Sequence, residues 1–367
     1  MDKTFIQRLK LSITTNCNLR CRYCFVKKGN KVTPFYIARN SIDLLLSSKK
    51  REKRSLCIYG GEPLLYPSLT KQILRYGRLR SGRLGRSLNI ACCSNALLLD
   101  EAILKFFRRY EVVLNISLFA QRKEHDNKRL NVLGKGTFDC VVKNIFLAKS
   151  ILPQRLLSVS LCISPGGAKD LEKDIMFVRE TFGIVYFNLE LVKMSSCRWT
   201  DLSVSQFVSS FKGLIDELIR GIEEDKFFFI GALSRELSMG QASISSRMYD
   251  KKISSCPKRL CLEVYPDGGM SFSGFLQNSP DRNKYLLGNV RHFEKSRIAD
   301  CDFYTDSSVC RDCIRSYLVD ANARPHEVLL DKYHHKLIIQ AAALLKKYAR
   351  RDPRFSRYIR LACASAY

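Results

Sequence analysis

The stretch from Ile13 to Phe25, ITTNCNLRCRYCF, places three cysteines, Cys17, Cys21 and Cys24, within eight residues. It overlaps a short alternating apolar segment, LKLSITT (9–15), which is typical of a β-strand. Three thiolates on a loop that leaves a strand can converge on one metal centre, and thiolates suit iron–sulfur clusters and zinc. A structural zinc needs a fourth ligand, but the nearest other cysteine or histidine is Cys57. We therefore expect a four-iron cluster with one iron open to a small molecule.

Strand-like and helix-like segments alternate through the first two-thirds of the chain. The strand-like runs are 9–15, 55–61, 88–95, 112–120, 156–164 and 183–192, and the helix-like runs are 35–48, 67–79, 100–110, 137–150, 168–182 and 204–224. This order predicts a parallel sheet wrapped by helices. Six units are too few for an eight-stranded barrel, so the expected fold class is α/β, an open, partial (β/α)6 TIM-like barrel. Ligand sites in such folds lie at the carboxyl ends of strands, where the cysteine loop begins.

The alternation stops near residue 230. Glycine, proline and serine punctuate the following segment, cysteines return in CPKRLC and CRDC, and a helix-like run over 332–349 comes near the end. We expect a core barrel domain over residues 1–230 and a smaller C-terminal auxiliary domain with cysteines over residues 231–367.

Composition limits the class of protein. The 367 residues are 46% hydrophobic, with no secretory signal and no apolar run of membrane-spanning length, so we expect a cytoplasmic protein without a membrane partner. Fifteen cysteines in such a chain are expected to be reduced thiols. The net charge of +27 would attract nucleic acid, an acidic peptide or anionic lipid, or it belongs to an ordinary solvated surface. The basic stretch over 346–360, KKYARRDPRFSRYIR, is equally open to a nucleic-acid patch or a solvated helix end.

The spacing C-x3-C-x2-C, with an aromatic residue before the last cysteine, resembles the signature of radical S-adenosylmethionine (radical SAM) enzymes. The resemblance continues in order along the chain. GGEP (60–63) is like the family's amino-group-binding motif, SNALL (94–98) is similar to its TNG turn, and ISLFA (116–120) stands where relatives read ISLDG. The segment over 125–145, HDNKRLNVLGKGTFDCVVKNI, is similar to one in the peptide-modifying branch of the family.

The resemblance implies two cofactors. Cys17, Cys21 and Cys24 would hold a 4Fe-4S cluster, whose open iron would bind the amino and carboxylate groups of S-adenosylmethionine. An electron, from a donor such as flavodoxin or ferredoxin, would split the cofactor into methionine and a 5′-deoxyadenosyl radical.

The same resemblance assigns contacts to S-adenosylmethionine. Tyr23 would meet the adenine through its backbone, Gly60 and Gly61 would allow close approach, Glu62 would accept from the ammonium group, and Pro63 and Asn95 belong to the matching turns. Ser117 and Arg129 would contact the ribose and carboxylate side, and Leu191 the adenine. His125 and Asp126 are expected to form a turn near the rim rather than to act as acid or base.

The segment CPKRLCLEVYPDGGMSFSG (256–274) resembles the start of the SPASM extension, the auxiliary-cluster domain of peptide maturases. The matching positions are Cys256, Cys261, the turn 266–268, the GN element 288–290, Cys310 and Cys313. Ser273 and Val319 replace expected cysteines, and closing cysteines are not found, so two complete clusters are not expected. One mixed auxiliary Fe-S cluster on Cys256, Cys261, Cys310 and Cys313 is the preferred hypothesis, with Cys301 as a substitute ligand; a structural zinc and a domain without metal are the alternatives.

The predicted function is that of a peptide maturase, a radical enzyme that acts on a ribosomally made and possibly acidic precursor peptide. Sulfatase maturation is not expected, because Gly274 stands where those relatives keep an aspartate. No separate leader-binding domain is expected before Leu11. The first alternative is a radical SAM enzyme acting on RNA or a small molecule, and the second is a zinc-stapled basic protein that binds nucleic acid.

Overall fold

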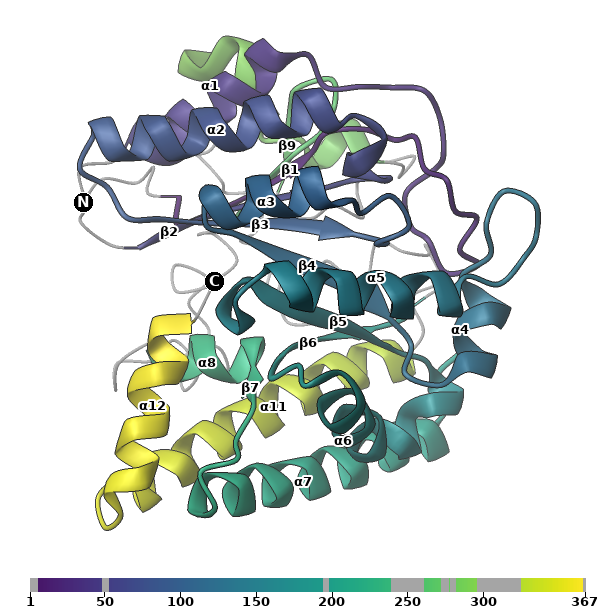
Figure 1. Ribbon diagram of the computed structural model, residues 1–367, viewed down its shortest axis with the longest axis vertical. Coiled ribbons are helices and arrows are strands. Elements are labelled where there is room, and N and C mark those ends of the chain that lie inside the picture. The colour runs from purple at the N-terminus through teal and green to yellow at the C-terminus, as the bar shows by residue number, and fades with distance from the viewer. Residues whose placement is uncertain are drawn as a thin grey trace.

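A single twisted sheet forms the centre of the molecule. The computed structural model describes residues 6–47, 53–193, 198–238, 261–271, 277, 282–295 and 325–365. In this part of the chain the sheet has ten strands in the order β10-β9-β8-β1-β2-β3-β4-β5-β6-β7 (Figure 1). The parallel strands of the first units are β1 (Arg8–Ser12), β2 (Arg54–Tyr59), β3 (Leu88–Ser94), β4 (Val112–Leu118), β5 (Leu157–Ile163) and β6 (Tyr186–Leu191).

Helices cover the outer face of this sheet. The helices that follow the six strands are α1 (Phe35–Ser47), α2 (Pro67–Arg83), α3 (Glu101–Arg109), α5 (Phe138–Ile151), α6 (Leu171–Phe182) and α7 (Asp201–Glu223). A short additional helix, α4 (Arg122–Lys128), lies between β4 and α5. Asp100 caps α3 by accepting from the backbone N–H of Ile103 at 2.7 Å, and Gly183, with φ of 63°, ends α6. The expected partial barrel of six β–α units is confirmed.

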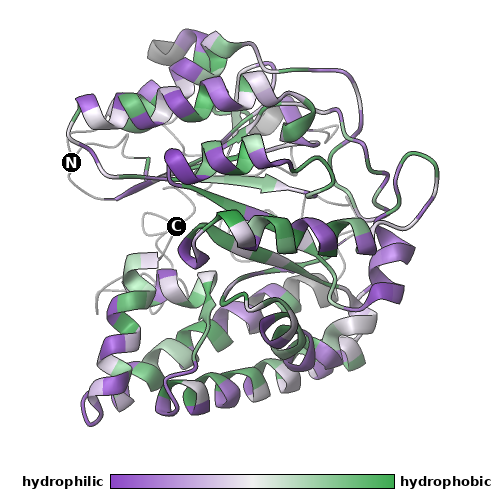
Figure 2. Cartoon of the chain, in the orientation of Figure 1, coloured by the Kyte–Doolittle hydropathy of each residue, from purple (hydrophilic) through white to green (hydrophobic). Residues whose placement is uncertain are grey.

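The alternation of residues along the strands separates the two faces of the sheet. In β2 and β3, Leu56, Ile58 and Ile90 are fully buried and belong to the main hydrophobic core, whereas their sequence neighbours are half-buried on the opposite face. Strand β5, which lies between β4 and β6, is buried along its whole length, as expected for a strand covered on both sides. Figure 2 shows mainly hydrophobic strands and helices in which hydrophobic and hydrophilic residues alternate.

The part of the chain after residue 230 extends the same sheet. Strand β8 (Cys261–Val264) pairs in parallel with β1, and β9 (Gly269–Ser271) and β10 (Gly288–Asn289) continue antiparallel beyond it. At the other edge, β7 (Phe229–Ile230) pairs with β6 and leads into α8 (Gly231–Ser238). The domain boundary at residue 230 stays a prediction.

Two helices close the described chain, α11 (Pro325–Tyr348) and α12 (Pro353–Ser365). Both pack against α7 and α8 (Figure 1). The basic stretch over 346–360 therefore lies in packed helices: the side chains of Phe355 and Tyr358 are buried, and the ring of Tyr358 stacks on that of Phe229 at 5.4 Å. Among the described helices, none combines the length and hydropathy that crossing a bilayer requires.

Candidate functional site

The cysteine loop leaves the carboxyl end of β1, as the sequence predicts. Cys17 is buried, and Cys21 and Cys24 are half-buried. The Cys17 sulfur accepts from the backbone N–H of Leu19 at 3.4 Å, and Lys28 Nζ donates to Cys24 Sγ at 3.0 Å. These donors suit thiolates, which is the form that binds metal.

The charges in this loop act on one another. Burial raises the pKa of Cys17 and that of Cys21, while the cations of Lys28 and Arg129 lower them in part. Burial lowers the pKa of Lys28, but the neighbouring sulfur atoms raise it above its usual value. Within the described residues no three cysteine, histidine or acidic side chains form a ready metal-binding group, so the three thiols are neighbours rather than a closed ligand set. Their loop position and donors fit a cluster that draws them together.

The loop is held against the segment that follows α4. The backbone N–H of Arg20 donates to the Leu130 carbonyl at 2.7 Å, that of Arg22 to the Lys128 carbonyl at 3.0 Å, and Leu19 bridges Asn131. The Arg20 guanidinium also donates to the Cys17 carbonyl at 2.8 Å. The HD-containing segment identified in the sequence therefore supports the backbone of the cysteine loop directly.

Gly60 and Gly61 follow β2 and lie against the start of the cysteine loop. Gly60 has φ of +135°, and a Cβ there would lie 2.5 Å from the Thr14 carbonyl oxygen. A Cβ at Gly61 would lie 1.9 Å from the Asn16 carbonyl oxygen. The close approach that requires glycine is therefore to the chain's own backbone, at Thr14 and Asn16 just before Cys17. Their contact with a cofactor stays a prediction.

Glu62 joins three loops at the rim of the barrel. Its carboxylate is buried and accepts from the backbone N–H of Leu64 at 3.0 Å, from Ser94 Oγ at 2.9 Å and from the backbone N–H of Asn95 at 2.8 Å. Burial raises its pKa, although these hydrogen bonds lower it in part. Pro63 begins the short 3-10 helix Pro63–Leu65 that Glu62 caps. Oε2 accepts one of the three bonds, which leaves it room for a further donor such as an ammonium group.

Asn95, at the end of β3, links this carboxylate to the cysteine loop. Its side-chain amide donates to Asn18 Oδ1 at 2.7 Å and approaches Cys17 Sγ at 3.9 Å. The next residue, Ala96, has φ of 67°, a left-handed conformation at the position where the family's turn has glycine. The structure thus brings Cys17, Glu62 and Asn95 together at one edge of the sheet.

Tyr23 and Arg129 meet on the other side of the cysteine loop. Arg129 is buried, and its Nη1 donates to the Tyr23 hydroxyl at 2.6 Å. The hydroxyl also lies 3.4 Å from Cys162 Sγ, and the Tyr23 ring meets the edge of Phe119 at 5.3 Å. The Nε atom of Arg129 is buried without a hydrogen-bond partner among the described residues. The sequence predicts a role for Tyr23 through its backbone only, and it does not indicate this side-chain cluster.

The predicted adenine and ribose contacts lie at the carboxyl ends of β6 and β4. Ser117 is a half-buried residue of β4, and Leu191 is the last residue of β6. Leu191 belongs to the main core, whereas its neighbour Val192 packs with Phe119, Cys162 and Tyr23. Val192 and Cys162 are therefore the residues that sequence reasoning missed at this rim, and their strand-end positions were the available signal.

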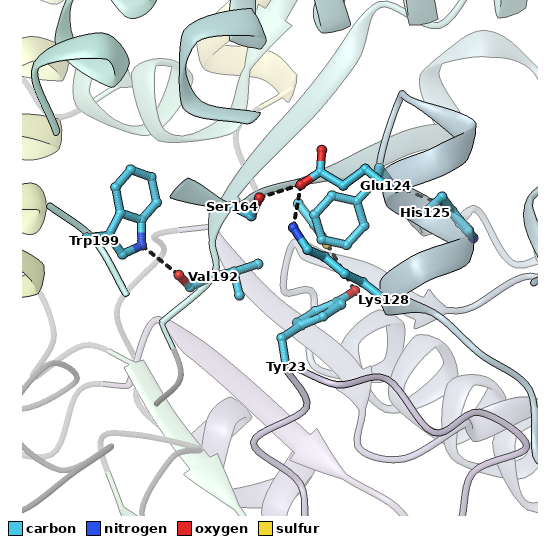
Figure 3. Close-up of polar contacts among 9 residues, drawn as sticks. Tyr23, Glu124, His125, Lys128, Ser164, Val192 and Trp199 are labelled. Carbon is cyan, nitrogen blue, oxygen red and sulfur yellow. Dashed lines mark hydrogen bonds and ion pairs between the residues drawn. The ribbon is translucent and has the colours of Figure 1, made fainter. Parts of the chain in front are cut away.

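A charged group lies beside the Tyr23 cluster (Figure 3). Glu124 Oε1 accepts from Lys128 Nζ at 2.6 Å and from the Ser164 hydroxyl. The Lys128 ammonium also lies 5.2 Å from the centre of the Phe119 ring. The i,i+4 spacing of Glu124 and Lys128 could have predicted the ion pair but not its place at the barrel rim.

His125 and Asp126 lie within helix α4 rather than in a turn, so the expected turn at these two residues is wrong. His125 is fully buried, and burial beside the cation of Arg129 lowers its pKa to about 3, so the ring is neutral. Asp126 Oδ1 accepts the backbone N–H groups of Thr137 and Phe138 at the start of α5, at 2.7 and 2.8 Å. Both residues therefore fix the backbone around Arg129.

Most of the predicted auxiliary site lies outside the described residues, namely Cys256, Cys301, Cys310 and Cys313, together with Ser273, Gly274 and Val319. Cys261 is described as the half-buried first residue of β8. The predicted turn around Gly268, whose φ is +85°, connects β8 to β9, and the predicted GN element is β10. Asn289 Nδ2 donates to the Asp267 carbonyl at 3.0 Å, which ties the two elements together.

The cysteine loop and its surrounding residues agree with the family to which this part of the chain is similar. The profile of the radical SAM superfamily matches residues 11–177. Residues 11–177 form a radical SAM domain. Enzymes of this superfamily use a 4Fe-4S cluster and S-adenosylmethionine, so the fit of Cys17, Cys21 and Cys24 to a cluster is consistent with the domain.

Relatives in sequence cover only part of the chain. The cysteine-type anaerobic sulfatase-maturating enzyme of Clostridium novyi is 27% identical over 146 residues, which are 36% of this chain and 37% of that enzyme. The GTP 3′,8-cyclase of Corynebacterium glutamicum (strain R) is 34% identical over 99 residues, 26% of each chain. The match therefore spans about a third or less of the length of these curated relatives.

Solved structures share the fold over a larger part of the chain. The structure of anSMEcpe with bound AdoMet, an anaerobic sulfatase-maturating enzyme, superposes with a TM-score of 0.69 at 15% identity over 98% of both chains. SuiB of Streptococcus suis, bound to precursor peptide SuiA, superposes with a TM-score of 0.55 at 16% identity over 83% of this chain and 66% of that chain. The radical SAM partial barrel is thus the fold of this protein.

Proposed function

We propose that this chain cleaves S-adenosylmethionine reductively and directs the resulting radical to a residue of a ribosomally made peptide. One electron and one S-adenosylmethionine give methionine and a 5′-deoxyadenosyl radical, which takes a hydrogen atom from the peptide and leaves the radical there. The observation that carries this proposal is the three-thiol loop at the end of β1, braced by Gly60, Gly61 and Glu62.

Different residues at the rim of the barrel would bind the cluster and S-adenosylmethionine. Cys17, Cys21 and Cys24 would hold the cluster, which supplies the electron and an open iron for the amino acid part of S-adenosylmethionine. Glu62 offers a fixed, buried carboxylate to a cationic ammonium group, and its pKa rise from burial would be reduced by that partner. Arg129 offers a buried Nε donor to a carboxylate or hydroxyl.

Structural similarity outside the radical SAM domain supports a peptide substrate. The likeness to anSMEcpe extends over almost the whole chain, including parts after residue 177. A structure of that protein holds a peptide, Cp18Cys, and SuiB was solved with its precursor peptide. The second candidate, a small nucleotide substrate, is favoured by the segment shared with GTP 3′,8-cyclase. A mixed auxiliary cluster on the C-terminal cysteines and a cytoplasmic location belong to the same proposal.

The test uses the full chain, reconstituted anaerobically with iron and sulfide. We expect 5′-deoxyadenosine from S-adenosylmethionine under dithionite, and a larger yield with a precursor peptide encoded beside this gene. Deuterium in the peptide should pass into 5′-deoxyadenosine, and the peptide mass should change. The matched control is the triple substitution of Cys17, Cys21 and Cys24 by alanine. Deuterium transfer from labelled GTP instead of peptide would favour the second candidate, and the absence of 5′-deoxyadenosine would contradict the proposal.

A further inference from the structure

The segment that contains the cysteine loop is rich in basic residues. Residues 6–42 contain no aspartate or glutamate. In the same span Arg22, Lys27 and Lys31 are exposed. Asp267, which is paired with Arg282, also interacts with Lys31. This part of the chain therefore contributes strongly to the positive field that the net charge of +27 predicts.

An exposed apolar turn lies beside these cations. Because Leu19 bridges Asn131, the turn over 131–135 is adjacent to the cysteine loop (Figure 1). At its tip Val132 is 56% exposed and Leu133 is 76% exposed, and Lys135 is exposed next to them. Exposed large apolar side chains within a charged surround are typical of sites that bind another protein.

Hydrogen bonds within the turn over 131–135 hold its conformation. Asn131 Oδ1 accepts the backbone N–H groups of Leu133 and Lys135, both at 2.9 Å. Gly134, with φ of +73°, allows the chain to reverse there. The apolar tip is thus presented in a fixed position, which lowers the entropy cost of docking. We call Arg22, Lys27, Lys31, Val132, Leu133 and Lys135 together the cysteine-loop face.

We infer that the cysteine-loop face docks an acidic protein that carries single electrons. This inference rests on the proposed function, because each cleavage of S-adenosylmethionine consumes one electron that must come from outside the chain. The carrier loses that electron, the sulfonium receives it through the cluster site, and one carbon–sulfur bond breaks. Cys21 and Cys24 are half-buried residues of the same loop that carries Arg22 and Lys27, so a carrier seated on this loop approaches the cluster ligands.

A position beside the cluster loop favours an electron carrier over the precursor peptide as the occupant. Opposite charges around an apolar contact speed encounter and set orientation, which suits a brief electron-transfer complex. The peptide must instead reach the barrel interior, where polar side chains such as Asn115 and Ser160 join neighbouring strands.

Binding to flavodoxin, an acidic flavoprotein, tests the inference directly. The reconstituted full chain would be titrated with flavodoxin at 50 mM and at 500 mM NaCl. We expect the double variant Lys27→Glu/Lys135→Glu to bind about tenfold more weakly at low salt, with the difference largely lost at high salt. Leu133→Ser should weaken binding several-fold at both salt concentrations. The control is Lys212→Glu/Lys347→Glu, which makes the same charge change on α7 and α11 and should bind like the wild type.

Activity separates this inference from the proposed function. We expect Lys27→Glu/Lys135→Glu to keep the wild-type yield of 5′-deoxyadenosine with dithionite and to lose about tenfold in rate with reduced flavodoxin. Wild-type binding by this variant, no binding of flavodoxin or ferredoxin to the wild type, or weaker binding of the precursor peptide instead would overturn the docking site. Failure of the wild type with dithionite would overturn the proposed function, while the binding titration would still decide the docking site.

Discussion

Substitution of Gly61 by alanine probes the junction on which the site is built. The added Cβ would lie 1.9 Å from the Asn16 carbonyl oxygen and 2.6 Å from its carbonyl carbon, both backbone atoms. The two loops would have to separate by about 1.5 Å to reach ordinary van der Waals contact. That separation would break the hydrogen bond from Gly61 N to the Thr14 carbonyl (2.7 Å) and the one from Glu62 N to the Asn16 carbonyl (2.8 Å). Two buried hydrogen bonds plus the residual strain predict a loss of about 3–5 kcal/mol in the free energy of unfolding.

Urea denaturation of the metal-free chain measures this loss, and iron content after reconstitution measures its effect on the site. Because Asn16 precedes Cys17, we expect the Gly61→Ala variant to bind much less iron through this loop. Gly82→Ala is the matched control, since a Cβ there meets nothing within 4 Å and the residue lies in α2. It should leave the chain unchanged or up to about 1 kcal/mol more stable. A loss below about 1 kcal/mol for Gly61→Ala, with normal iron content, would refute the reasoning.

Three further predictions concern stability and use urea denaturation. Tyr23→Phe removes the acceptor of the buried Arg129 guanidinium and should cost about 1–3 kcal/mol; an unchanged midpoint would contradict this. Asp126→Ala removes the cap of α5 and should cost about 1–2 kcal/mol, whereas Asp126→Asn should retain part of it. Burial raises the pKa of Asp174 from 3.8 to about 6. The folded chain then holds a proton that the unfolded chain has lost, so stability should fall as pH rises from 4 to 7. Asp174→Asn should remove about 1–3 kcal/mol of that fall, and an identical pH profile for the variant would count against the assignment.

The order of the elements was predictable because each depends on local pattern. Strands such as β3 and helices such as α3 show their periods within a few residues, and the cysteine spacing is visible as a string. The turn at Gly268 was likewise predictable from its sequence. These features need no knowledge of distant contacts.

Features that depend on distant contacts were not predictable from pattern. Strand β8 pairs with β1 across some two hundred and fifty residues of sequence, and no local signal specifies that partner. The sequence suggested that Gly60 and Gly61 make room for a cofactor, but the backbone that they approach directly is that of Thr14 and Asn16.

The direction of side chains at strand ends could also not be predicted from the sequence. Alternation assigns faces within a strand, but the chain turns after Leu191, and Val192 rather than Leu191 joins Tyr23. Tyr23 itself shows the same limit, because its hydroxyl partners come from Arg129 and Cys162, which are distant in sequence.

The central claim is that three thiols on one loop hold a cluster with an iron free for S-adenosylmethionine. The most direct measurement is electron paramagnetic resonance of the reduced, reconstituted full chain, recorded with and without S-adenosylmethionine. The account predicts a 4Fe-4S signal that shifts when the cofactor is added and that disappears when Cys17, Cys21 and Cys24 are all replaced by alanine. A signal that does not shift when S-adenosylmethionine is added, or one that persists unchanged in the triple variant, would contradict this claim.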